Sequence, residues 1–451
     1  MNVKAIKRVY FVGIGGIGMS ALARFFVAQG AVVSGYDRTE TALTKKLAEE
    51  GMRIHYTDDI ALIDKDAELI VYTPAIPKDH KELNWLRDNG FAVYKRSDVL
   101  QWISESLHAI TVAGTHGKTT VSTMIAYLLR ETGYGCNAFL GGISVNYNSN
   151  YWSSTNDTAV IEADEYDRSF LKLFPDIAVL TAMDPDHLDI YGTAEEMEKA
   201  FIQYTHNIKA GGTLLVKHGL HRSAELNAAN KITYSLSNDA ADIYGIDMVQ
   251  RNGGYTFSIN ARSWSIKDLE LNIGGLHNVE NAIVAVAVTQ MLGIDPVKVK
   301  TALAGFRGIK RRFEYIIKND KMVFIDDYAH HPEELAALIR SAKHLFPERR
   351  CVVSFQPHLF SRTRDFADGF AQSLDMADEV LLLDIYPARE LPMEGVTTQM
   401  IAEKMTTPHT ILSKEGLLEY VKRAPLDMFI VSGAGDIDKL VEPIKQILEA
   451  K

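Results

Sequence analysis

The feature that most constrains this chain is the glycine-rich stretch G-T-H-G-K-T-T at residues 114–120. The apolar run at 108–113 predicts a buried strand before it. Apolar residues at i, i+3, i+4, i+7 and i+8 from Val121 predict a helix after it, which Gly133 can end. A strand, a turn and a helix N-terminus direct unpaired backbone N–H groups and a positive dipole end at one point, which suits phosphate oxygens. We therefore expect a nucleotide site here rather than a glycine turn with a surface lysine.

The side chains of this stretch indicate how the nucleotide is held. Lys118 is expected to neutralise the β- and γ-phosphates, and the Thr119 hydroxyl to ligate Mg²⁺. The spacing G-x-x-G-K-T-T is shorter than the general P-loop pattern, whose first glycine would fall on Val112. ATP is the expected nucleotide. The residues predicted to surround its phosphates, called the phosphate loop below, are Gly114, Thr115, His116, Gly117, Lys118, Thr119 and Thr120.

A second glycine motif, G-I-G-G-I-G at 13–18, follows the strand-like run 8–12, and Asp37 ends the next strand. Alone, this pattern is typical of a dinucleotide-dependent dehydrogenase. The backbone amides of such a turn recognise pyrophosphate oxygens and not nicotinamide, so any diphosphate would fit. A turn with a purely structural role is the third possibility. The local residues do not decide between a dinucleotide, another diphosphate and no ligand. The residues expected to bind the ligand are Gly13, Gly15, Gly16, Ile17, Gly18 and Asp37.

Acidic and histidine residues follow two further strands near the phosphate loop. Glu162 comes first after the apolar run 158–161, where a carboxylate is well placed to hold Mg²⁺. Glu165 and Asp167 are expected to belong to a solvated acidic loop. His187, after the next strand, would ligate a second metal ion or orient substrate, although a lone histidine is more often structural.

Later motifs suit an adenosine and a transferring phosphate. H-N-V-E-N-A at 277–282 opens a helix with two asparagines on one face, and Arg311 and Arg312 form a possible phosphate clamp. D-D-Y-A-H-H-P at 326–332 ends a strand and begins a helix. F-Q-P-H at 355–358 ends the following strand, and Arg362 and Arg364 lie in the loop beyond it. Because open α/β sheets bind ligands at the carboxyl ends of their strands, both loops are candidate site elements.

Composition and charge argue against several classes of function. The 451 residues allow about three domains of roughly 150 residues each. The formal net charge of −10 argues against nucleic-acid binding, which usually needs a basic face. Cys136 and Cys351 lie in apolar settings and predict buried thiols rather than a disulfide or a metal site. No run reaches membrane-spanning length and none resembles a signal sequence, so we expect a cytoplasmic protein with no membrane insertion.

Strand and helix patterns alternate almost from end to end, which favours an α/β fold with mostly parallel sheets. We expect a Rossmann-like N-terminal domain over 1–106 and a central P-loop ATPase-like domain with a mostly parallel sheet over 107–308. A C-terminal Rossmann-like α/β domain is expected over 309–451, with amphipathic helices over 332–345 and 366–376. The stretch 231–273, where sheet residues alternate with glycine and asparagine, predicts antiparallel strands.

Taken in order, these motifs resemble those of the Mur ligase family of peptidoglycan synthesis over essentially the whole chain. They are V-G-I-G-G-I-G-M-S, G-T-H-G-K-T-T, E-A-D-E, D-H-L-D, H-N-V-E-N-A, R-R-F, D-D-Y-A-H-H-P and F-Q-P-H. Each is modest alone, and together in this order they are highly specific. The resemblance implies three domains that bind a UDP-sugar, ATP and an amino acid respectively. The first glycine turn would then hold a UDP diphosphate and not a dinucleotide.

The resemblance also implies a role for each matching residue. Those implied to contact ATP are Lys118, Thr119, Asn278, Asn281, Arg312 at the phosphates and Asp327 at the ribose. Those implied to hold two Mg²⁺ ions are Thr119, Glu162 and His187, with His187 also meeting the sugar carboxylate. Those implied to shape the amino-acid end are Tyr328, His330 and Arg362. Those implied to take part in catalysis are Lys118, His187, Arg312 and His330.

The activity implied is the ATP-dependent joining of L-alanine to the lactyl carboxylate of UDP-N-acetylmuramate, through an acyl phosphate. The alternative within the family is a recycling ligase that attaches a preformed peptide to the same sugar nucleotide. Either His187 or His330 would accept the amine proton. Because an acyl phosphate must be shielded from water, closure of the third domain over the site is expected.

Two positions depart from the family pattern. Leu359 follows F-Q-P-H where alanine-adding members often have arginine, which puts that contact to the amino-acid carboxylate in doubt. Residues 200–203 read A-F-I-Q where several sister ligases carry a modified lysine, so none is expected here. A non-catalytic binding protein and a dehydrogenase are disfavoured because Lys118, Thr119 and Glu162 occur together with the histidine motif.

Overall fold

The computed structural model describes residues 3–185, 188–388 and 390–451. The chain divides into two compact units, each of α/β construction. The first comprises Met1–Met248, Phe257–Leu269 and Val279–Gly305, and the second comprises Val249–Thr256, Glu270–Asn278 and Phe306–Lys451. Within the described ranges, no helix combines the length and the apolar character needed to cross a bilayer.

The first unit opens with a five-stranded parallel sheet in the order β3-β2-β1-β4-β5. Successive residues of β1 (Arg8–Val12) face opposite sides: Tyr10 joins the core under α3 (Lys81–Asp88), and Phe11 joins the core around α1 (Ile17–Ala28). The other elements here are β2 (Val32–Tyr36), α2 (Ala42–Glu49), β3 (Arg53–His55), β4 (Leu69–Tyr72), β5 (Val93–Lys95), α4 (Arg96–Ser106) and the short 3-10 helices η1 (Val3–Ala5) and η2 (Ile60–Leu62).

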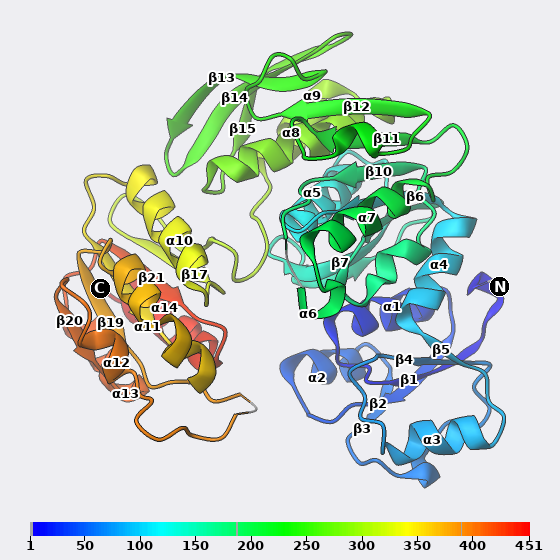
Figure 1. The fold of residues 1–451 in the computed structure, drawn as a ribbon, viewed down its shortest axis with the longest axis horizontal. Coiled ribbons are helices and arrows are strands. Elements are labelled where there is room, and N and C mark those ends of the chain that lie inside the picture. Colours follow the sequence, from blue (N-terminus) through cyan, green and yellow to red (C-terminus); the bar gives the residue numbers. More distant parts are fainter. Residues whose placement is uncertain (1–2, 186–187, 389) are drawn as a thin grey trace. The chain divides into compact units, whose positions relative to one another are not determined.

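Helix α1 is buried on nearly all sides, as its almost wholly apolar sequence predicts. One side packs on the first sheet, and another packs on the hairpin of β7 (Asn137–Ser144) and β8 (Ser149–Trp152) (Figure 1). The Phe25 ring lies 5.4 Å from that of Phe139, centroid to centroid. A single hydrophobic core therefore continues from the first sheet into the central sheet.

The central sheet has ten strands in the order β15-β14-β13-β12-β11-β10-β6-β9-β7-β8. The strand before the phosphate loop, β6 (His108–Ala113), lies between β10 (Ile177–Leu180) and β9 (Thr158–Glu162) and is parallel to both. The other strands are β11 (Thr213–Lys217), β12 (Asn230–Ser235), β13 (Ile243–Arg251), β14 (Gly254–Ala261) and β15 (Ser265–Leu271). The helices are α5 (Lys118–Glu131), α6 (Leu188–Tyr191), α7 (Ala194–Thr205), α8 (Leu276–Met291), α9 (Pro296–Ala304) and the 3-10 helices η3 (Tyr166–Lys172) and η4 (Ser223–Glu225).

One prediction about this sheet was partly wrong. The stretch 231–273 was expected to be antiparallel, but β12 pairs in parallel with β11, and β13 begins in parallel with β12. Antiparallel pairing holds for β13, β14 and β15, which are neighbours in the sheet joined by turns of two and three residues, too short for a parallel crossover. Glycine and asparagine between short strands mark turns, and they do not determine which neighbour a strand pairs with.

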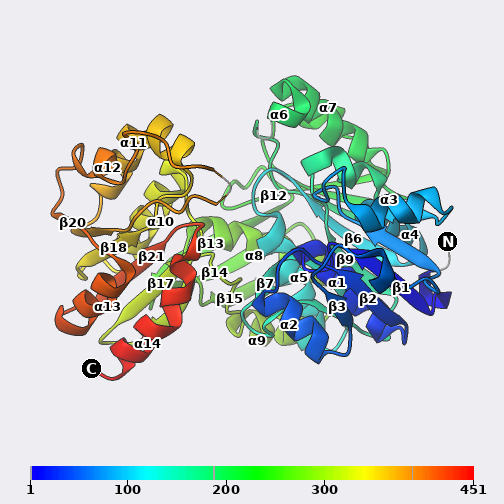
Figure 2. The ribbon, with the colours of Figure 1, turned by 90° about the horizontal axis from the view of Figure 1, so that it is seen from below.

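The second unit is built on a six-stranded sheet in the order β16-β17-β21-β18-β19-β20, parallel except for the β16–β17 pair. Its strands are β16 (Glu314–Lys318), β17 (Val323–Asp327), β18 (Cys351–Phe355), β19 (Glu379–Leu382), β20 (His409–Ile411) and β21 (Met428–Ser432). Its helices are α10 (Pro332–Leu345), α11 (Phe360–Leu374), α12 (Gln399–Ala402), α13 (Lys414–Arg423), α14 (Val441–Glu449) and the 3-10 helix η5 (Asp436–Leu440). Figure 2 shows α10, α11 and α12 on one face of this sheet and α13 and α14 on the other.

The predicted elements are largely confirmed. The helix predicted over 332–345 has those bounds as α10, and α5 ends just before Gly133, whose φ is +81°. The helix predicted over 366–376 begins earlier, at Phe360, because Phe366 marks a kink between two helical pieces. Both cysteines are buried and unbridged, as predicted.

Candidate active site

The phosphate loop lies between β6 and α5, at the carboxyl edge of the central sheet. Gly114 and Gly117 have φ of +130° and +83°, conformations that L side chains rarely adopt. A Cβ at Gly114 would overlap the Thr181 hydroxyl, and one at Gly117 would lie 3.1 Å from the Asn281 Oδ1 atom. Backbone conformation therefore favours glycine at both positions, and at Gly114 space excludes a side chain as well.

Lys118, the first residue of α5, turns back over this loop. Its ammonium donates to the carbonyl of Gly114 at 2.8 Å and to the Glu165 carboxylate at 2.8 Å. The Glu165 side chain is only 1% exposed, and burial raises the pKa of its carboxyl while Lys118 lowers it. The prediction of a solvated Glu165 was wrong, because this carboxylate is buried as the counter-ion of the loop lysine. The Asp167 side chain lies outside the part of the chain that is described.

Thr119 and Glu162 form the second contact of the loop. The Thr119 hydroxyl donates to Glu162 Oε1 at 2.9 Å, and the Gly141 backbone N–H donates to Glu162 Oε2 at 2.9 Å. Burial raises the pKa of the half-buried Glu162, and the nearby charge of Lys118 and these hydrogen bonds oppose that shift. A hydroxyl oxygen and a carboxylate held side by side are the hard ligands that Mg²⁺ prefers, so the donor set fits the predicted metal.

The loop after β10 supports the phosphate loop from the other side. The Thr181 hydroxyl donates to the carbonyls of Ala113 and His116, and the Asp184 backbone N–H donates to the Thr115 hydroxyl at 3.2 Å. The His116 ring is largely exposed, and Thr120 lies in the first turn of α5. His187, predicted to follow in this loop, lies outside the described residues.

The first glycine turn is held by the end of β2. The N–H groups of Gly13 and Ile14 donate to the Tyr36 carbonyl at 2.8 and 3.0 Å, and the Gly15 N–H donates to Asp37 Oδ2 at 2.7 Å. Gly16 then caps α1, whose first residues are Ile17 and Gly18. Asp37 thus accepts a hydrogen bond from the turn itself.

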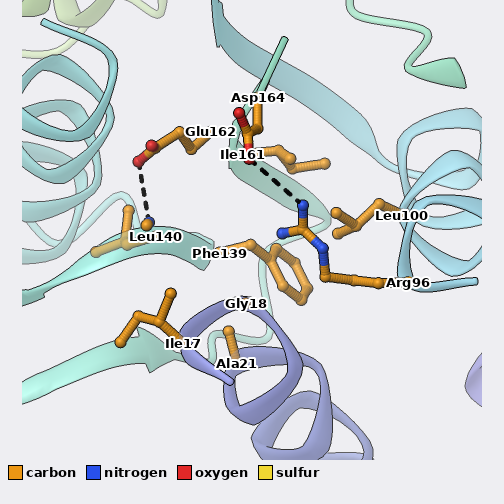
Figure 3. Close-up of a pocket in the computed structure, with 11 residues that line it drawn as sticks. Ile17, Gly18, Ala21, Arg96, Leu100, Phe139, Leu140, Ile161, Glu162 and Asp164 are labelled. Atoms are coloured by element: carbon orange, nitrogen blue, oxygen red, sulfur yellow. Dashed lines mark hydrogen bonds and ion pairs between the residues drawn. The ribbon is translucent and has the colours of Figure 1, made fainter. Parts of the chain in front are cut away.

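A pocket of about 130 Å³ lies between the first turn of α1 and the end of β9 (Figure 3). Ile17 and Gly18 line one side, and Glu162 lines the other. The Arg96 guanidinium lies over Gly18, where an added Cβ would overlap its Nη1 atom, and Arg96 Nη2 lies 3.9 Å from Asp164 Oδ2. The pocket therefore brings the glycine turn, a cation and the carboxylate beside the phosphate loop to one place.

Helix α8 carries both predicted asparagines in its first two turns. Asn278 is buried, and its side-chain amide donates to the Gly274 carbonyl at 2.6 Å. Asn281 is also buried, and its amide oxygen faces Gly117 of the phosphate loop.

In the second unit, the neighbouring arginines have different environments. Arg311 donates to the Gly433 carbonyl, lies 3.5 Å from the buried Asp326 carboxylate and covers the face of the Tyr328 ring. Arg312 is exposed. Asp327 accepts the backbone N–H groups of Phe313 at 2.6 Å and Ala329 at 2.7 Å, and burial raises its pKa to about 6.

The remaining predicted residues gather at the carboxyl ends of β17 and β18. The His330 ring contacts those of Tyr328 and His358, with centroids 5.2 and 6.1 Å apart. Burial lowers the pKa of His330, and the nearby Arg362 contributes to the shift. Leu359 has φ +72° and ψ 138°, a region that favours glycine, so the turn after F-Q-P-H is strained.

Three family models match successive parts of the chain: the Mur ligase family catalytic domain at 8–108, the Mur ligase middle domain at 112–289 and the Mur ligase glutamate ligase domain at 311–435. A UDP-N-acetylmuramate–L-alanine ligase from Cytophaga hutchinsonii is 47% identical over 461 residues, which cover 100% of this chain and 99% of the relative. One of the same name from Parabacteroides distasonis is 48% identical over 456 residues, covering 99% and 98%. The chain belongs to the Mur ligase family.

Solved structures agree with this assignment. A UDP-N-acetylmuramate–alanine ligase from Thermotoga maritima superposes on this Mur ligase with a TM-score of 0.82 at 27% identity, covering 99% of each chain. A murein peptide ligase from Psychrobacter arcticus shares the fold, with a TM-score of 0.65 at 23% identity and 98% coverage of both. Three α/β domains with mostly parallel sheets are thereby confirmed, and the boundaries at 106/107 and 308/309 stay predictions.

Several residues of the site were not predicted from the sequence of this Mur ligase. Arg96 begins a helix far from any glycine motif, and Thr181 precedes the D-P-D-H-L-D motif. Gly141 takes part through its backbone alone, which no side-chain pattern reveals. Glu165 was visible in E-A-D-E, but its burial depends on the lysine that packs against it.

Proposed function

We propose that this Mur ligase joins L-alanine to the lactyl carboxylate of UDP-N-acetylmuramate, converting ATP to ADP and phosphate. Relatives of that name match the full chain at 47% and 48% identity. Within the structure, the observation that carries the proposal is the pocket in which the first turn of α1 faces Glu162 (Figure 3). An acid bound at the glycine turn would there lie beside the phosphate loop. We place the reaction in the cytoplasm, where ATP and UDP-sugars are found.

The first step activates the acid. A lactyl carboxylate oxygen attacks the γ-phosphorus of ATP, and the bond from that phosphorus to the β–γ bridging oxygen breaks. ADP is the leaving group, and the sugar now carries an acyl phosphate. Both reactants are anionic, so Lys118 and Arg312 are proposed to neutralise the charge that develops on the transferring group. Arg96 is proposed to attract an anionic part of the sugar nucleotide into the pocket, since its guanidinium lines it.

The second step forms the amide. The free amine of L-alanine attacks the acyl carbon, the bond from that carbon to the phosphate oxygen breaks, and the amine nitrogen loses a proton. Burial lowers the pKa of His330 and so favours its neutral form, which is the form that accepts a proton. His187 stays the second candidate. Tyr328 and Arg362 are proposed to contact the alanine beside His330.

The other predicted residues complete the substrate sites. Thr119, Glu162 and His187 would hold two Mg²⁺ ions, which when bound would screen the phosphate charges. The loop 114–120 is proposed to surround the ATP phosphates and the turn 13–18, with Asp37, the UDP diphosphate. Asn278, Asn281 and Asp327 are proposed to contact ATP.

Phosphate release with ATP, UDP-N-acetylmuramate and single amino acids tests the proposal, omitting one component at a time. We expect release only when ATP, the sugar nucleotide and L-alanine are all present. Glycine and L-serine measure how strictly alanine is selected. Faster turnover with a preformed tripeptide than with L-alanine would contradict the proposal in favour of a recycling ligase.

Shielding of the acyl phosphate leads to a second measurement. Since water would hydrolyse this intermediate, we propose that the C-terminal domain closes when the substrates bind. Small-angle scattering is expected to show a smaller radius of gyration with an ATP analogue and UDP-N-acetylmuramate than without them. An unchanged radius would contradict closure.

A further inference from the structure

The pocket between the glycine turn and Glu162 has one wall from helix α1 and one from strand β7. Its α1 wall directly follows the glycine turn, and its β7 wall contains Phe139 and Gly141 (Figure 3). The Gly141 N–H donates to Glu162 at 2.9 Å, so β7 also holds the carboxylate beside the phosphate loop. The position of α1 on the β7–β8 hairpin therefore determines how the two substrate sites face each other.

Apolar packing contributes to this contact but does not fix its register. Phe25 of α1 packs against both Phe139 and Tyr151, with ring centroids 5.4 and 6.4 Å away. Hydrophobic contact is non-directional, so rings of this kind tolerate small slides of the helix along the hairpin. A directional contact is needed to set the helix position.

Asn150 provides that directional contact. It is the second residue of β8 and is completely buried. Its amide N–H₂ donates to the Ile17 carbonyl and lies 3.1 Å from the Ser20 hydroxyl, and its amide oxygen accepts a hydrogen bond from Arg24. One side chain thus binds the first two turns of α1.

The Arg24 end of this contact is itself fixed. Arg24 is 8% exposed, and its guanidinium donates to both carboxylate oxygens of Glu50 at 2.7 and 3.0 Å. A bidentate pair orients the guanidinium, so the N–H group that reaches Asn150 has one direction. The helix is held at Ile17 and at Arg24, on both sides of its second turn.

We propose that Asn150 is a positioning residue for the ligase reaction, holding the glycine turn at the separation from Glu162 that lets the bound acid reach the γ-phosphate. This inference rests on the proposed function. Asn150 does not line the pocket, and it reaches the glycine turn only through the Ile17 backbone carbonyl at the start of α1. We therefore expect both substrate sites to form without it. Misplacement of two bound reactants by about 1 Å is enough to lower the rate by 10²-fold.

The test compares Asn150→Ala and Asn150→Asp with the wild-type protein. We expect kcat for phosphate release to fall ~10-fold or more in both. The dissociation constants for ADP and for UDP-N-acetylmuramate, measured separately by calorimetry, are expected to change less than about two-fold. The calorimetric stoichiometry counts the folded protein, so a smaller active fraction is distinguished from a lower kcat.

Lys46→Ala is the matched control. The Lys46 ammonium donates to the Asn148 carbonyl at 2.8 Å, so it joins the same hairpin to the first domain without touching α1. Its kcat is expected to equal that of wild type. Ser20→Ala, which leaves the bond from Asn150 to Ile17 in place, is expected to lower kcat less than Asn150→Ala does.

Two results would overturn the inference while the proposed function stands. Wild-type kcat in Asn150→Asp, with normal stoichiometry, would show that the donor to Ile17 has no positioning role. A rise in both dissociation constants with kcat unchanged would assign Asn150 to site formation instead. An inactive wild-type protein would refute the proposed function, and the inference with it. If Asn150→Ala does not fold, Asn150→Asp and Ser20→Ala carry the test.

Discussion

Lys118 and Glu165 form a buried ion pair, with 2.8 Å between the ammonium nitrogen and a carboxylate oxygen. The lysine predicted to meet the phosphates is therefore already held by an acid of the neighbouring loop. Glu165 is almost completely buried, and the Lys118 ammonium is the cation that lies against its carboxylate and stabilises its charge. Lys118 is thus expected to affect stability through its contact with Glu165 and turnover through its contact with the phosphates.

Lys118→Ala is expected to lower turnover at least ~10²-fold, the scale for removing one preorganised charge donor. It is also expected to lower the free energy of unfolding by about 3 kcal/mol, because Glu165 is left buried without that partner. Phosphate release and urea unfolding measure the two effects. The double variant with Glu165→Gln is expected to regain stability and not turnover. Near-normal turnover in Lys118→Ala would refute the assignment of the phosphate loop.

Glu162→Gln tests the proposed metal carboxylate. The amide keeps the size of the side chain and loses the charge, so we expect the Mg²⁺ concentration for half-maximal activity to rise ~10-fold or more. A Mg²⁺ titration of phosphate release measures this. Ser122→Ala is the control, because Ser122 reaches Glu162 only at 3.5 Å. Equal Mg²⁺ dependence in wild type and Glu162→Gln would remove Glu162 from the metal site.

Glu82 predicts a pH dependence of stability in the first domain. It is fully buried beside Tyr10, and burial raises its pKa to about 7 from an ordinary 4.5. The folded protein then binds this proton more tightly than the unfolded chain. The contribution of protonated Glu82 to the free energy of unfolding is full below pH 4.5 and is lost as the pH rises through 7.

Thermal unfolding of wild type and Glu82→Gln from pH 5 to 8 measures this effect. Burial lowers the pKa of His55 and of His80, which acts in the opposite sense, so the difference between the two proteins is the useful quantity. We expect the melting temperature of wild type, relative to the variant, to fall as the pH rises. A difference that is constant with pH would contradict the buried acid.

Arg311 and Arg312 are expected to give opposite phenotypes. Arg311→Ala removes the cation beside the buried Asp326, whose pKa burial raises to about 7, so stability should fall by a few kcal/mol. Arg312→Ala changes an exposed side chain and is expected to leave the melting temperature unchanged while lowering kcat ~10-fold or more. Differential scanning fluorimetry and phosphate release separate them. Equal melting temperatures for both variants would contradict this division.

The sequence predicted the parts of the fold and site that follow from local pattern. Periodicity located α5 and α10, and ordered motifs located the phosphate loop. What it missed depends on tertiary contact. Arg311 and Arg312 are the same residue type, yet Arg311, with φ +60°, lies beside the buried Asp326, whereas Arg312 is exposed. Asn150 lies in a polar stretch whose composition is typical of a turn. Its burial depends on the packing of α1 over it, which the local sequence does not indicate.

The core shared by α1 and the β7–β8 hairpin affects how enzymes of this kind can be recombined. Cutting a gene at the end of the first domain would separate Phe25 from Phe139 and Asn150 from Ile17. A chimera that exchanges the first domain between homologues should therefore carry residues 137–152 along with it. The unit of modular exchange is discontinuous in the gene, although it is contiguous in space.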